Sequence, residues 1–301
     1  MKVLITGVAG FVGSHTADKF LKEGWDVAGI DDYSTGNHKN VPKGVDFFCY
    51  DVTDFDTMNR IIPEINPTVI VHLAAQPSLL ESIEYPEFDA LVNIIGTVNL
   101  AKIARDLNIP RFVFSSTSAV YSSQDTKEDS LGLFPENPYG ISKLTAESYI
   151  RSLLLDEGVV LRYGNVYGPR QVALGENQLV PRVLDHIRRR KEFVIHGDGL
   201  QTRDFVYVED VANANFQAAT VELPTDFCLN VSFGSSHSVI DVVTEIAKLT
   251  AFTGDIEHGP KIEDEREHVI MPNDLAKEQL KWEPKFSLHD GLKKTVTSYG
   301  R

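Results

Sequence analysis

The chain has 301 residues, more than one compact core usually holds, so we expect one large domain joined to a smaller lobe. Apolar residues make up 42% and charged residues 24%, as in globular proteins, and no apolar run approaches the roughly 18 residues that a membrane span needs. The formal charge of -14 disfavours a nucleic-acid-binding surface. We therefore expect neither a membrane nor a nucleic acid as a partner.

Strand-like sequence begins at Lys2 and leaves no room for a cleavable secretion signal, so we expect a cytoplasmic protein. The two cysteines, Cys49 and Cys228, are far apart and have no His or Cys at the spacing of a metal site. We predict that both are buried thiols and that the protein holds no metal.

Short β-branched segments alternate with segments of helical length in the first half of the chain. This alternation predicts a doubly wound parallel α/β sheet of the Rossmann type. The predicted strands have the sequences KVLITG, DVAGID, DFFCYD, TVIVHLA, RFVFSS and VVLRYGN. After Asn165, Pro and Gly become more frequent and the alternation ends. We predict a first domain over 1–164 and a smaller mixed lobe over 165–301, with part of 203–221 returning to the first domain.

Helical spacing of apolar residues predicts two helices in the smaller lobe. The first covers SVIDVVTEIAKLT at 238–250. The second covers PNDLAKEQLKW at 272–282, where Asn273 and Asp274 are typical of a helix cap.

The first predicted strand runs into TGVAGFVGSH, which places Gly7, Gly10 and Gly13 at a strand-to-helix turn. Such glycines permit a tight turn, the approach of a pyrophosphate and close packing of a helix whose N-terminus favours phosphate. The second strand ends in Asp31 and Asp32, where a carboxylate can accept ribose hydroxyls and repel a 2′-phosphate. The alternative is that the glycines only form turns and the acids only a loop. Both features together predict NAD rather than NADP as cofactor.

The segment NPYGISKLTAES places Tyr139 and Lys143 four residues apart at the start of a predicted helix, so they share a face. The alternative interpretation is a half-exposed aromatic residue beside a surface lysine. Next to a nucleotide-binding turn, a lysine charge that lowers the tyrosine pKa from about 10 would make Tyr139 a base. Upstream, the hydroxyl-rich sequence FSSTSAVY at 114–121 ends a predicted strand and forms either a simple turn or a wall of an active site.

These motifs, in this order, resemble the extended short-chain dehydrogenase/reductase family, and within it the nucleotide-sugar epimerases of the UDP-glucose 4-epimerase type. The resemblance covers nearly the whole chain. It also rests on DVTD at 51–54, HLAAQ at 72–76, LRYGNVYGPRQ at 161–171 and GDGLQTRDFVYVEDV at 197–211. It implies an NAD-dependent isomerase that epimerises the sugar of a nucleotide diphosphate, a UDP-sugar above all, at C4 through a transient 4-keto sugar. It also implies a homodimer.

The resemblance implies roles for individual residues. Thr117, Tyr139 and Lys143 would be catalytic, with Thr117 orienting the sugar hydroxyl that Tyr139 deprotonates. The residues implied to bind the cofactor are Gly7, Gly10, Phe11, Val12, Gly13, Asp31, Asp32, Asp51, Val52, Ala74, Ala75, Tyr139 and Lys143. The residues implied to bind the substrate are Asn165, Asn177, Gln178, Leu179, Val180, Arg203 and Arg266. Asn165 and Arg203 would hold the diphosphate, for which arginine is a suitable bidentate donor.

The two positions after Thr117 distinguish between reactions of this family. Sugar 4,6-dehydratases carry an acid pair there, and decarboxylases keep a Glu at the second position. Here the residues are Ser118 and Ala119, which cannot transfer a proton as a carboxylic acid does, so we expect epimerisation. Two alternatives stay open: a nucleotide-sugar oxidoreductase, dehydratase or synthase of the same fold, and a dinucleotide-binding protein without catalysis. Arg162 and His72 are interpreted as structural.

Overall fold

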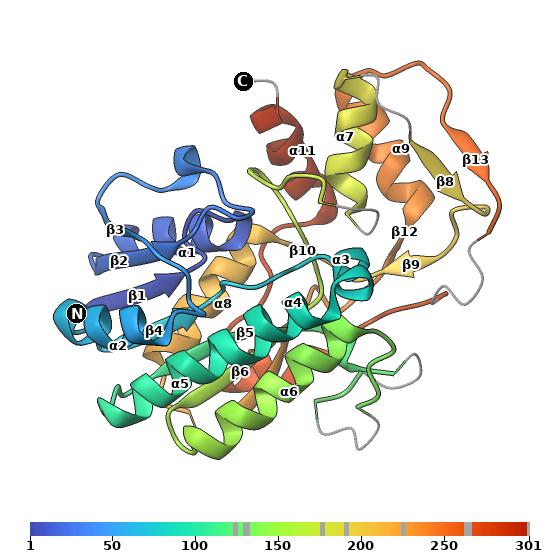
Figure 1. Ribbon diagram of the computed structural model, residues 1–301. Helices are drawn as coiled ribbons and strands as arrows, with labels where there is room; N and C mark the ends of the chain where they lie inside the picture. The colour runs from blue at the N-terminus through green and yellow to red at the C-terminus, as the bar shows by residue number, and fades with distance from the viewer. Residues whose placement is uncertain are drawn as a thin grey trace.

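The computed structural model describes residues 1–122, 126–128, 133–174, 178–189, 193–223, 227–261 and 267–299. Figure 1 shows a central sheet with helices on both of its faces and a second lobe, containing α7, α9 and α11, beside the sheet. The predicted fold class, a doubly wound α/β sheet with a smaller lobe, is confirmed.

Within the described residues, seven parallel strands form the central sheet in the order β11-β6-β5-β4-β1-β2-β3. They are β1 Lys2–Thr6, β2 Asp26–Asp31, β3 Val45–Cys49, β4 Val69–His72, β5 Phe112–Thr117, β6 Gly158–Tyr163 and β11 Phe227–Val231. The inner strands are buried on both faces, so their sequences are almost continuously apolar. The strand order reverses between β1 and β4, and ligands of such sheets bind outside the carboxyl ends of the strands at this point.

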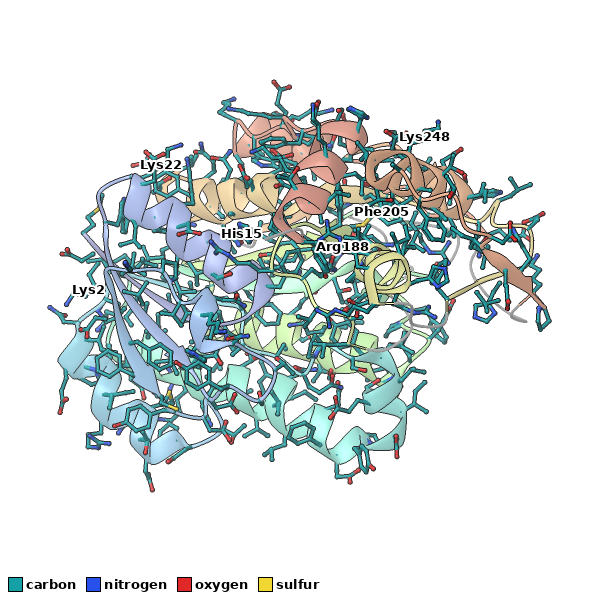
Figure 2. The ribbon with its side chains drawn as sticks, turned by 90° about the horizontal axis from the view of Figure 1, so that it is seen from above. Lys2, His15, Lys22, Arg188, Phe205 and Lys248 are labelled. Atoms are coloured by element: carbon teal, nitrogen blue, oxygen red, sulfur yellow. The ribbon has the colours of Figure 1, made fainter. Side chains whose placement is uncertain are left out.

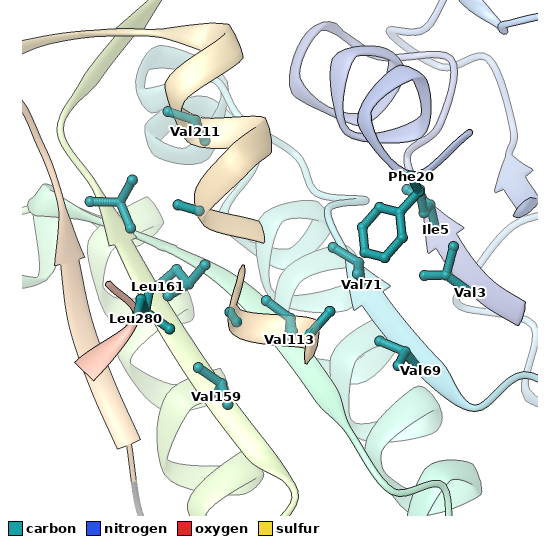
Figure 3. Packing of buried hydrophobic residues seen from close by; sticks show 14 of the residues in the cluster. Val3, Ile5, Phe20, Val69, Val71, Val113, Val159, Leu161, Val211 and Leu280 are labelled. Carbon is teal, nitrogen blue, oxygen red and sulfur yellow. The ribbon is translucent and has the colours of Figure 1, made fainter. Parts of the chain in front are cut away.

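Helices cover both faces of the sheet. On one face, α1 lies against α8, and Phe20 and Val211 of these helices belong to one apolar cluster with the valines of β1, β4, β5 and β6 (Figure 3). On the other face, α2, α5 and α6 bury a second cluster. These helices are α1 Phe11–Lys22, α2 Phe55–Ile65, α5 Thr97–Asp106, α6 Pro138–Leu153 and α8 Val208–Thr220. In α2, Met58, Ile61 and Ile65 are buried at helical spacing, which explains why this helix packs flat against the sheet.

Short strand pairs and three helices make up the second lobe. The pairs are β7 Asn165–Tyr167 with β10 Phe205–Tyr207, β8 Val194–His196 with β13 Glu257–Gly259, and β9 Thr202–Arg203 with β12 His237–Ser238. The helices are α7 Leu179–Arg189, α9 Val239–Thr250 and α11 Leu288–Tyr299. They bury a separate apolar core that includes Val183, Val242 and Leu292. The helix predicted over 238–250 is α9 and is confirmed.

The helix predicted over 272–282 is shorter than expected. It is α10, Asp274–Gln279, which lies against β11. Asn273 precedes this helix but does not cap it with its side chain. Instead, the Asn273 amide donates a hydrogen bond to the carbonyl of Ser232 at 2.9 Å, so tertiary contacts override the local capping preference.

The chain after residue 164 contributes to the central sheet as well as to the second lobe. Helix α8 packs along α1, and β11 pairs with β6, with Leu229 opposite Leu161. The sequence predicts the return of part of 203–221 but not of β11, because one short strand among Gly-rich and Pro-rich segments gives no alternation signal. The division at residue 164 stays a prediction.

The first half of the chain also contains several short helical elements. They are α3 Leu79–Glu84, α4 Pro86–Ala90, a π-helical turn at Leu91–Gly96 that continues into α5, and 3-10 turns at His38–Asn40 and Ser118–Val120. None of the helices in the described ranges has the length and apolar character needed to cross a membrane.

The prediction of two buried thiols is wrong for Cys49. This residue ends β3, the edge strand of the sheet, and is exposed, whereas Cys228 in β11 is partly buried. Strand β3 has a neighbour on one side only, so its outer end faces solvent.

Candidate active site

A cavity of about 560 Å³ lies between the sheet and the second lobe. Thr117, Ser118 and Tyr139 line it from the sheet side, and Asn165 and Arg203 line it from the second lobe. In the view from above, α1 runs from Lys22 to His15 toward the lobe that carries Phe205 and Arg188 (Figure 2). The His15 Nε2 donates to the carbonyl of Pro169 at 2.9 Å, which ties α1 to the loop after β7.

The start of α6 fixes the position of Tyr139. The side chain of Asn137 accepts the Gly140 N–H at 2.9 Å, and Pro138 occupies the first helical position, where its missing N–H has no cost. The hydroxyl of Ser82 accepts the N–H of Tyr139 at 3.2 Å. The sequence NPY therefore begins the helix so that Tyr139 stands in its first turn and lines the cavity.

Thr117, at the end of β5, lines the same wall of the cavity as Tyr139, close enough to act on the pKa of its phenol. Burial raises the pKa of Tyr139 to about 12, although the Thr117 hydroxyl lowers it, and the charge of Asp89 adds to the rise. The expectation that the Lys143 charge brings this pKa below its ordinary value is wrong, because desolvation has the largest effect on the Tyr139 phenol and raises its pKa. The protein alone therefore holds Tyr139 as a neutral phenol.

Lys143 lies one turn further along α6 and is 2% exposed. Its Nζ stands 4.5 Å from the centroid of the Phe114 ring, so an aromatic face of β5 lies under the ammonium. Burial lowers the pKa of Lys143 to about 8, while the charges of Asp89 and Glu147 raise it. The predicted pair thus consists of a partly buried tyrosine that lines the cavity and a buried lysine one turn further along the same helix.

The glycine turn has the close backbone approaches that a dinucleotide phosphate requires. Gly7 has a φ of +71°, and a Cβ there would lie 2.7 Å from the backbone nitrogen of Ala74. A Cβ at Gly13 would lie 1.9 Å from the carbonyl oxygen of Gly7, so no larger residue fits between α1 and the turn. Gly10 stands at the N-cap of α1 without a side chain. These residues leave the helix N-terminus open to a phosphate and therefore fit NAD.

Asp31 and Asp32 differ in environment. Asp31 is 8% exposed, and its Oδ2 and Oδ1 accept the N–H groups of Ala9 and Tyr33 at 2.9 and 2.8 Å. Burial raises the pKa of Asp31, and these backbone hydrogen bonds oppose the rise. Asp32 is exposed and accepts the Ser34 N–H. A carboxylate has about four lone-pair sites, so Asp31 can still accept ribose hydroxyls.

The other predicted cofactor residues lie at or near the carboxyl ends of β1, β3 and β4. Asp51 is exposed and accepts the Thr53 N–H at 2.8 Å. The Ala74 N–H donates to Thr6 Oγ1 at 3.2 Å. The remaining members are Phe11, which lines the cavity, Val52, which is buried, and Val12 and Ala75, which are partly buried.

The predicted substrate residues come partly together. The cavity is lined by Asn165, Gln178, Leu179, Val180 and Arg203. Asn177 and Arg266 lie outside the described residues. The Gln178 Oε1 accepts the Leu174 N–H at 2.8 Å.

Arg182 also lines the cavity, and the sequence motifs do not indicate it. Its guanidinium lies 5.4 Å from the centroid of the Phe193 ring, which lines the same cavity. Arg182 stands three residues after Leu179 on α7, so helical spacing from a predicted substrate residue is the signal that could have found it.

Arg162 and His72 have structural partners, in agreement with their interpretation. Arg162 donates from Nε and Nη2 to the Glu147 carboxylate at 3.0 and 2.7 Å, and from Nη1 to the Tyr121 hydroxyl at 3.0 Å. His72 lies within hydrogen-bond distance of Thr6 and Thr97, and burial lowers its pKa to about 3. A neutral, fully bonded imidazole is not poised to move protons.

A tyrosine one helical turn from a buried lysine, beside a dinucleotide-binding turn, is suited to proton transfer coupled to hydride transfer. Residues 3–227 match the sequence profile of the NAD dependent epimerase/dehydratase family, and the chain belongs to that family. The predicted family and the predicted cofactor, NAD, are confirmed.

Individual relatives agree with this assignment. A putative UDP-glucose 4-epimerase of Methanocaldococcus jannaschii is 35% identical, over 98% of this chain and 97% of that protein. The crystal structure of UDP-glucose 4-epimerase with UDP-glucose from Thermotoga maritima has a TM-score of 0.94 and 34% identity, covering 100% of this chain and 99% of that one. The UDP-glucose 4-epimerase of Thermus thermophilus in complex with NAD has a TM-score of 0.90 and 34% identity, with the same coverage. The predicted enzyme class, an NAD-dependent nucleotide-sugar epimerase, is confirmed.

Proposed function

We propose that the protein epimerises a UDP-sugar at C4 through a transient 4-keto sugar. The observation that carries this proposal is that Thr117 and Tyr139 line one wall of the cavity, with Ser118 and Ala119 directly after Thr117. A phenol beside a hydroxyl can exchange a proton with a sugar hydroxyl. Neither Ser118 nor Ala119 carries a carboxylic acid, so these two positions supply no proton-transfer group for elimination of water or for decarboxylation.

The turn at 7–13 and the buried carboxylate of Asp31 would hold NAD by its pyrophosphate and its adenosine ribose. Bound NAD supplies a hydride acceptor for the oxidation of the sugar to the ketone and a hydride donor for the reduction of that ketone. The positive charge of Lys143, buried on the same helix face, favours the ionised form of Tyr139 once the site is assembled.

The chain's own residues then move one proton in each direction. Tyr139 takes the proton of the C4 hydroxyl as the hydride leaves C4, which gives a 4-keto sugar, and Thr117 orients that hydroxyl through its own hydrogen bond. When the hydride returns to the opposite face of C4, Tyr139 gives the proton back to the oxygen. The configuration at C4 is inverted without net oxidation.

The second lobe would hold the nucleotide while the sugar turns. Asn165 and Arg203 line the cavity from β7 and β9, across from Thr117 and Tyr139 of the sheet side. A guanidinium can bind a diphosphate through two hydrogen bonds at once. An anchor at the diphosphate leaves the sugar free to present either face of C4 to the same reacting groups.

Incubation of the protein with UDP-, dTDP-, GDP- and CDP-glucose, followed by chromatography, tests this function. We expect conversion of UDP-glucose to its C4 epimer, faster than conversion of the other nucleotides. No epimer from any of the four would reject the proposal. Net accumulation of NADH would point to the oxidoreductase alternative instead.

We also infer that two copies associate through a helical face of the sheet domain. Exposed apolar side chains gather on α3, α4 and the residue between them, on the π-helical turn and on α6: Leu80, Ile83, Tyr85, Phe88, Leu91, Ile95, Ile141 and Tyr149. Monomers rarely expose so many neighbouring apolar groups, and α5 and α6 lie side by side as half of a four-helix bundle would. Sedimentation should give a dimer, and Ile141→Glu with Tyr149→Glu should give a monomer.

The cytoplasmic location stays a prediction.

A further inference from the structure

A buried polar cluster lies between α4, the loop after β4 and the start of α6, the helix that carries Tyr139 and Lys143. Asp89 of α4 is 1% exposed, and its Oδ1 accepts hydrogen bonds from the side-chain amides of Asn93 at 2.9 Å and Gln76 at 3.2 Å. The Asn93 amide also donates to the hydroxyl of Ser142 at 3.2 Å. The Ser142 hydroxyl in turn donates to the carbonyl of Tyr139 at 3.0 Å. The cluster therefore reaches the first turn of α6 directly.

The π-helical turn at Leu91–Gly96 places Asn93 within this cluster. Its Oδ1 accepts the backbone N–H of Gln76 at 2.9 Å, and its Nδ2 donates to the carbonyl of Gln76 at 3.1 Å. Gln76 follows Ala74 and Ala75, which lie at the carboxyl end of β4. π-Helical turns often mark functional sites. Here the turn joins Asp89 to the loop after β4 and to α6.

Two carboxylates act electrostatically on the ammonium of Lys143, those of Asp89 and Glu147. Glu147 is bonded at both oxygens by the Arg162 guanidinium, at 3.0 and 2.7 Å, so its charge is already balanced. In the described part of the chain, the side chains that hydrogen-bond the Asp89 carboxylate are the amides of Gln76 and Asn93, which are uncharged. A buried ammonium and a buried carboxylate are both costly unless each has a counter-charge.

We propose that Asp89 is a positioning residue of the reaction, whose buried carboxylate is the counter-charge that keeps Lys143 protonated beside Tyr139. This inference rests on the proposed function, because it assigns Asp89 a role in tuning the residues that move the proton. Four observations support it: the burial of Asp89, its neutral hydrogen-bond partners, the link through Ser142 to α6, and the separate pairing of Glu147 with Arg162.

The charge of Asp89 acts on both members of the pair in the same direction. It raises the pKa of Lys143 against the effect of burial, and it adds to the rise in the pKa of Tyr139. The other ionisable groups near Lys143 are Glu147, which is paired with Arg162, and His72, whose pKa the Lys143 charge lowers. Removing the Asp89 charge should therefore lower both pKa values, so the activity profile should move to lower pH as a whole.

The first test is the pH dependence of epimerisation by Asp89→Asn, which is isosteric and retains an acceptor for Asn93 and Gln76. We expect the whole profile to move by about 1 pH unit or more toward acid, since a charge at close range shifts a pKa by roughly that amount. Ser142→Ala is the matched control, because it removes a hydrogen bond from the cluster but no charge. A profile that is lower at every pH but not displaced would mean that Asp89 is merely structural.

The second test is a double-mutant cycle in thermal or urea unfolding, which needs no cofactor and no activity. Asp89→Asn should lower the unfolding midpoint in the wild-type background, where it leaves Lys143 without a counter-charge. In the Lys143→Met background the same change should cost less than half as much. Should Asp89→Asn alone fail to fold, folding of the double variant supports the proposal, and failure of both overturns it. Equal losses in the two backgrounds also overturn it. If the wild type forms no epimer, the proposed function fails while this cycle still decides the role of Asp89.

Discussion

The Asp31 carboxylate accepts a hydrogen bond from the backbone N–H of Ala9, with 2.9 Å between Oδ2 and the nitrogen. This contact joins the end of β2 to the glycine turn that follows β1. Asp31 is also 8% exposed, so water screens its charge poorly. The acid therefore stands at a fixed place beside the turn, where a 2′-phosphate on the adenosine ribose would meet an unscreened like charge.

This contact predicts that the protein binds NAD(H) well and NADP(H) poorly. Replacing Asp31 by Ala should weaken NAD binding and reduce the discrimination, because the ribose loses an acceptor and the 2′-phosphate loses its repulsion. Calorimetric titration of both cofactors into the wild type and the variant measures this. Equal affinity of the wild type for the two cofactors would contradict the role of Asp31.

Arg203→Ala should weaken the binding of UDP and UDP-sugars while leaving NAD binding nearly intact. A charge-assisted hydrogen bond to phosphate contributes roughly 1.5–3 kcal/mol, which corresponds to a loss of about 10- to 150-fold in affinity. Arg188→Ala is a suitable control, because Arg188 belongs to the same lobe, is exposed and donates to the carbonyl of Val296. A parallel loss of NAD affinity in Arg203→Ala would place this residue in the cofactor site or the fold.

The position of Thr117 and Tyr139 on the same cavity wall predicts a graded series of activities. Tyr139→Phe should lower kcat by about 10²–10⁴-fold, the usual contribution of a positioned proton-transfer group. Thr117→Ser keeps the hydroxyl and should retain much of the activity, whereas Thr117→Ala should lose an intermediate amount. Unchanged melting temperatures would show that the variants are folded. If Thr117→Ala lost as much as Tyr139→Phe, Thr117 would do more than orient the substrate.

The ion pair of Glu147 and Arg162 predicts a large and asymmetric effect on stability. Both side chains are buried, so Arg162→Met leaves a carboxylate without its counter-charge and should lower the free energy of unfolding by about 3–5 kcal/mol. Combining it with Glu147→Gln removes the unpaired charge and should recover part of the loss. Urea denaturation of the two variants measures the difference. A double variant less stable than Arg162→Met would argue against a charge effect.

Local motifs predicted the parts of the site that depend on local structure. The glycine turn and the pair of Tyr139 and Lys143 were predictable because local backbone structure fixes their positions. A strand-to-helix turn places the glycines, and one helical turn separates Tyr139 from Lys143. The pKa of Tyr139 was not predictable in the same way, since it depends on how much water the assembled cavity excludes. Burial reverses the shift expected from the Lys143 charge.

Residues that reach the site only through tertiary packing were not predictable from the sequence. Asp89 meets α6 only because a π-helical turn and the loop after β4 fold together, and neither has a sequence signal. Likewise, the strand pairing of β11 with β6 joins residues far apart in the chain, which periodicity within a short window does not reveal.

The most direct test of the proposed epimerisation is to follow UDP-glucose that carries deuterium at C4. Removal and return of the hydride at the same carbon predict UDP-galactose with the deuterium retained at C4 and no net formation of NADH. The Tyr139→Phe variant should form this product far more slowly. A 4-keto-6-deoxy sugar with the deuterium at C6, and no epimer, would contradict the assignment and show that the site eliminates water despite Ser118 and Ala119.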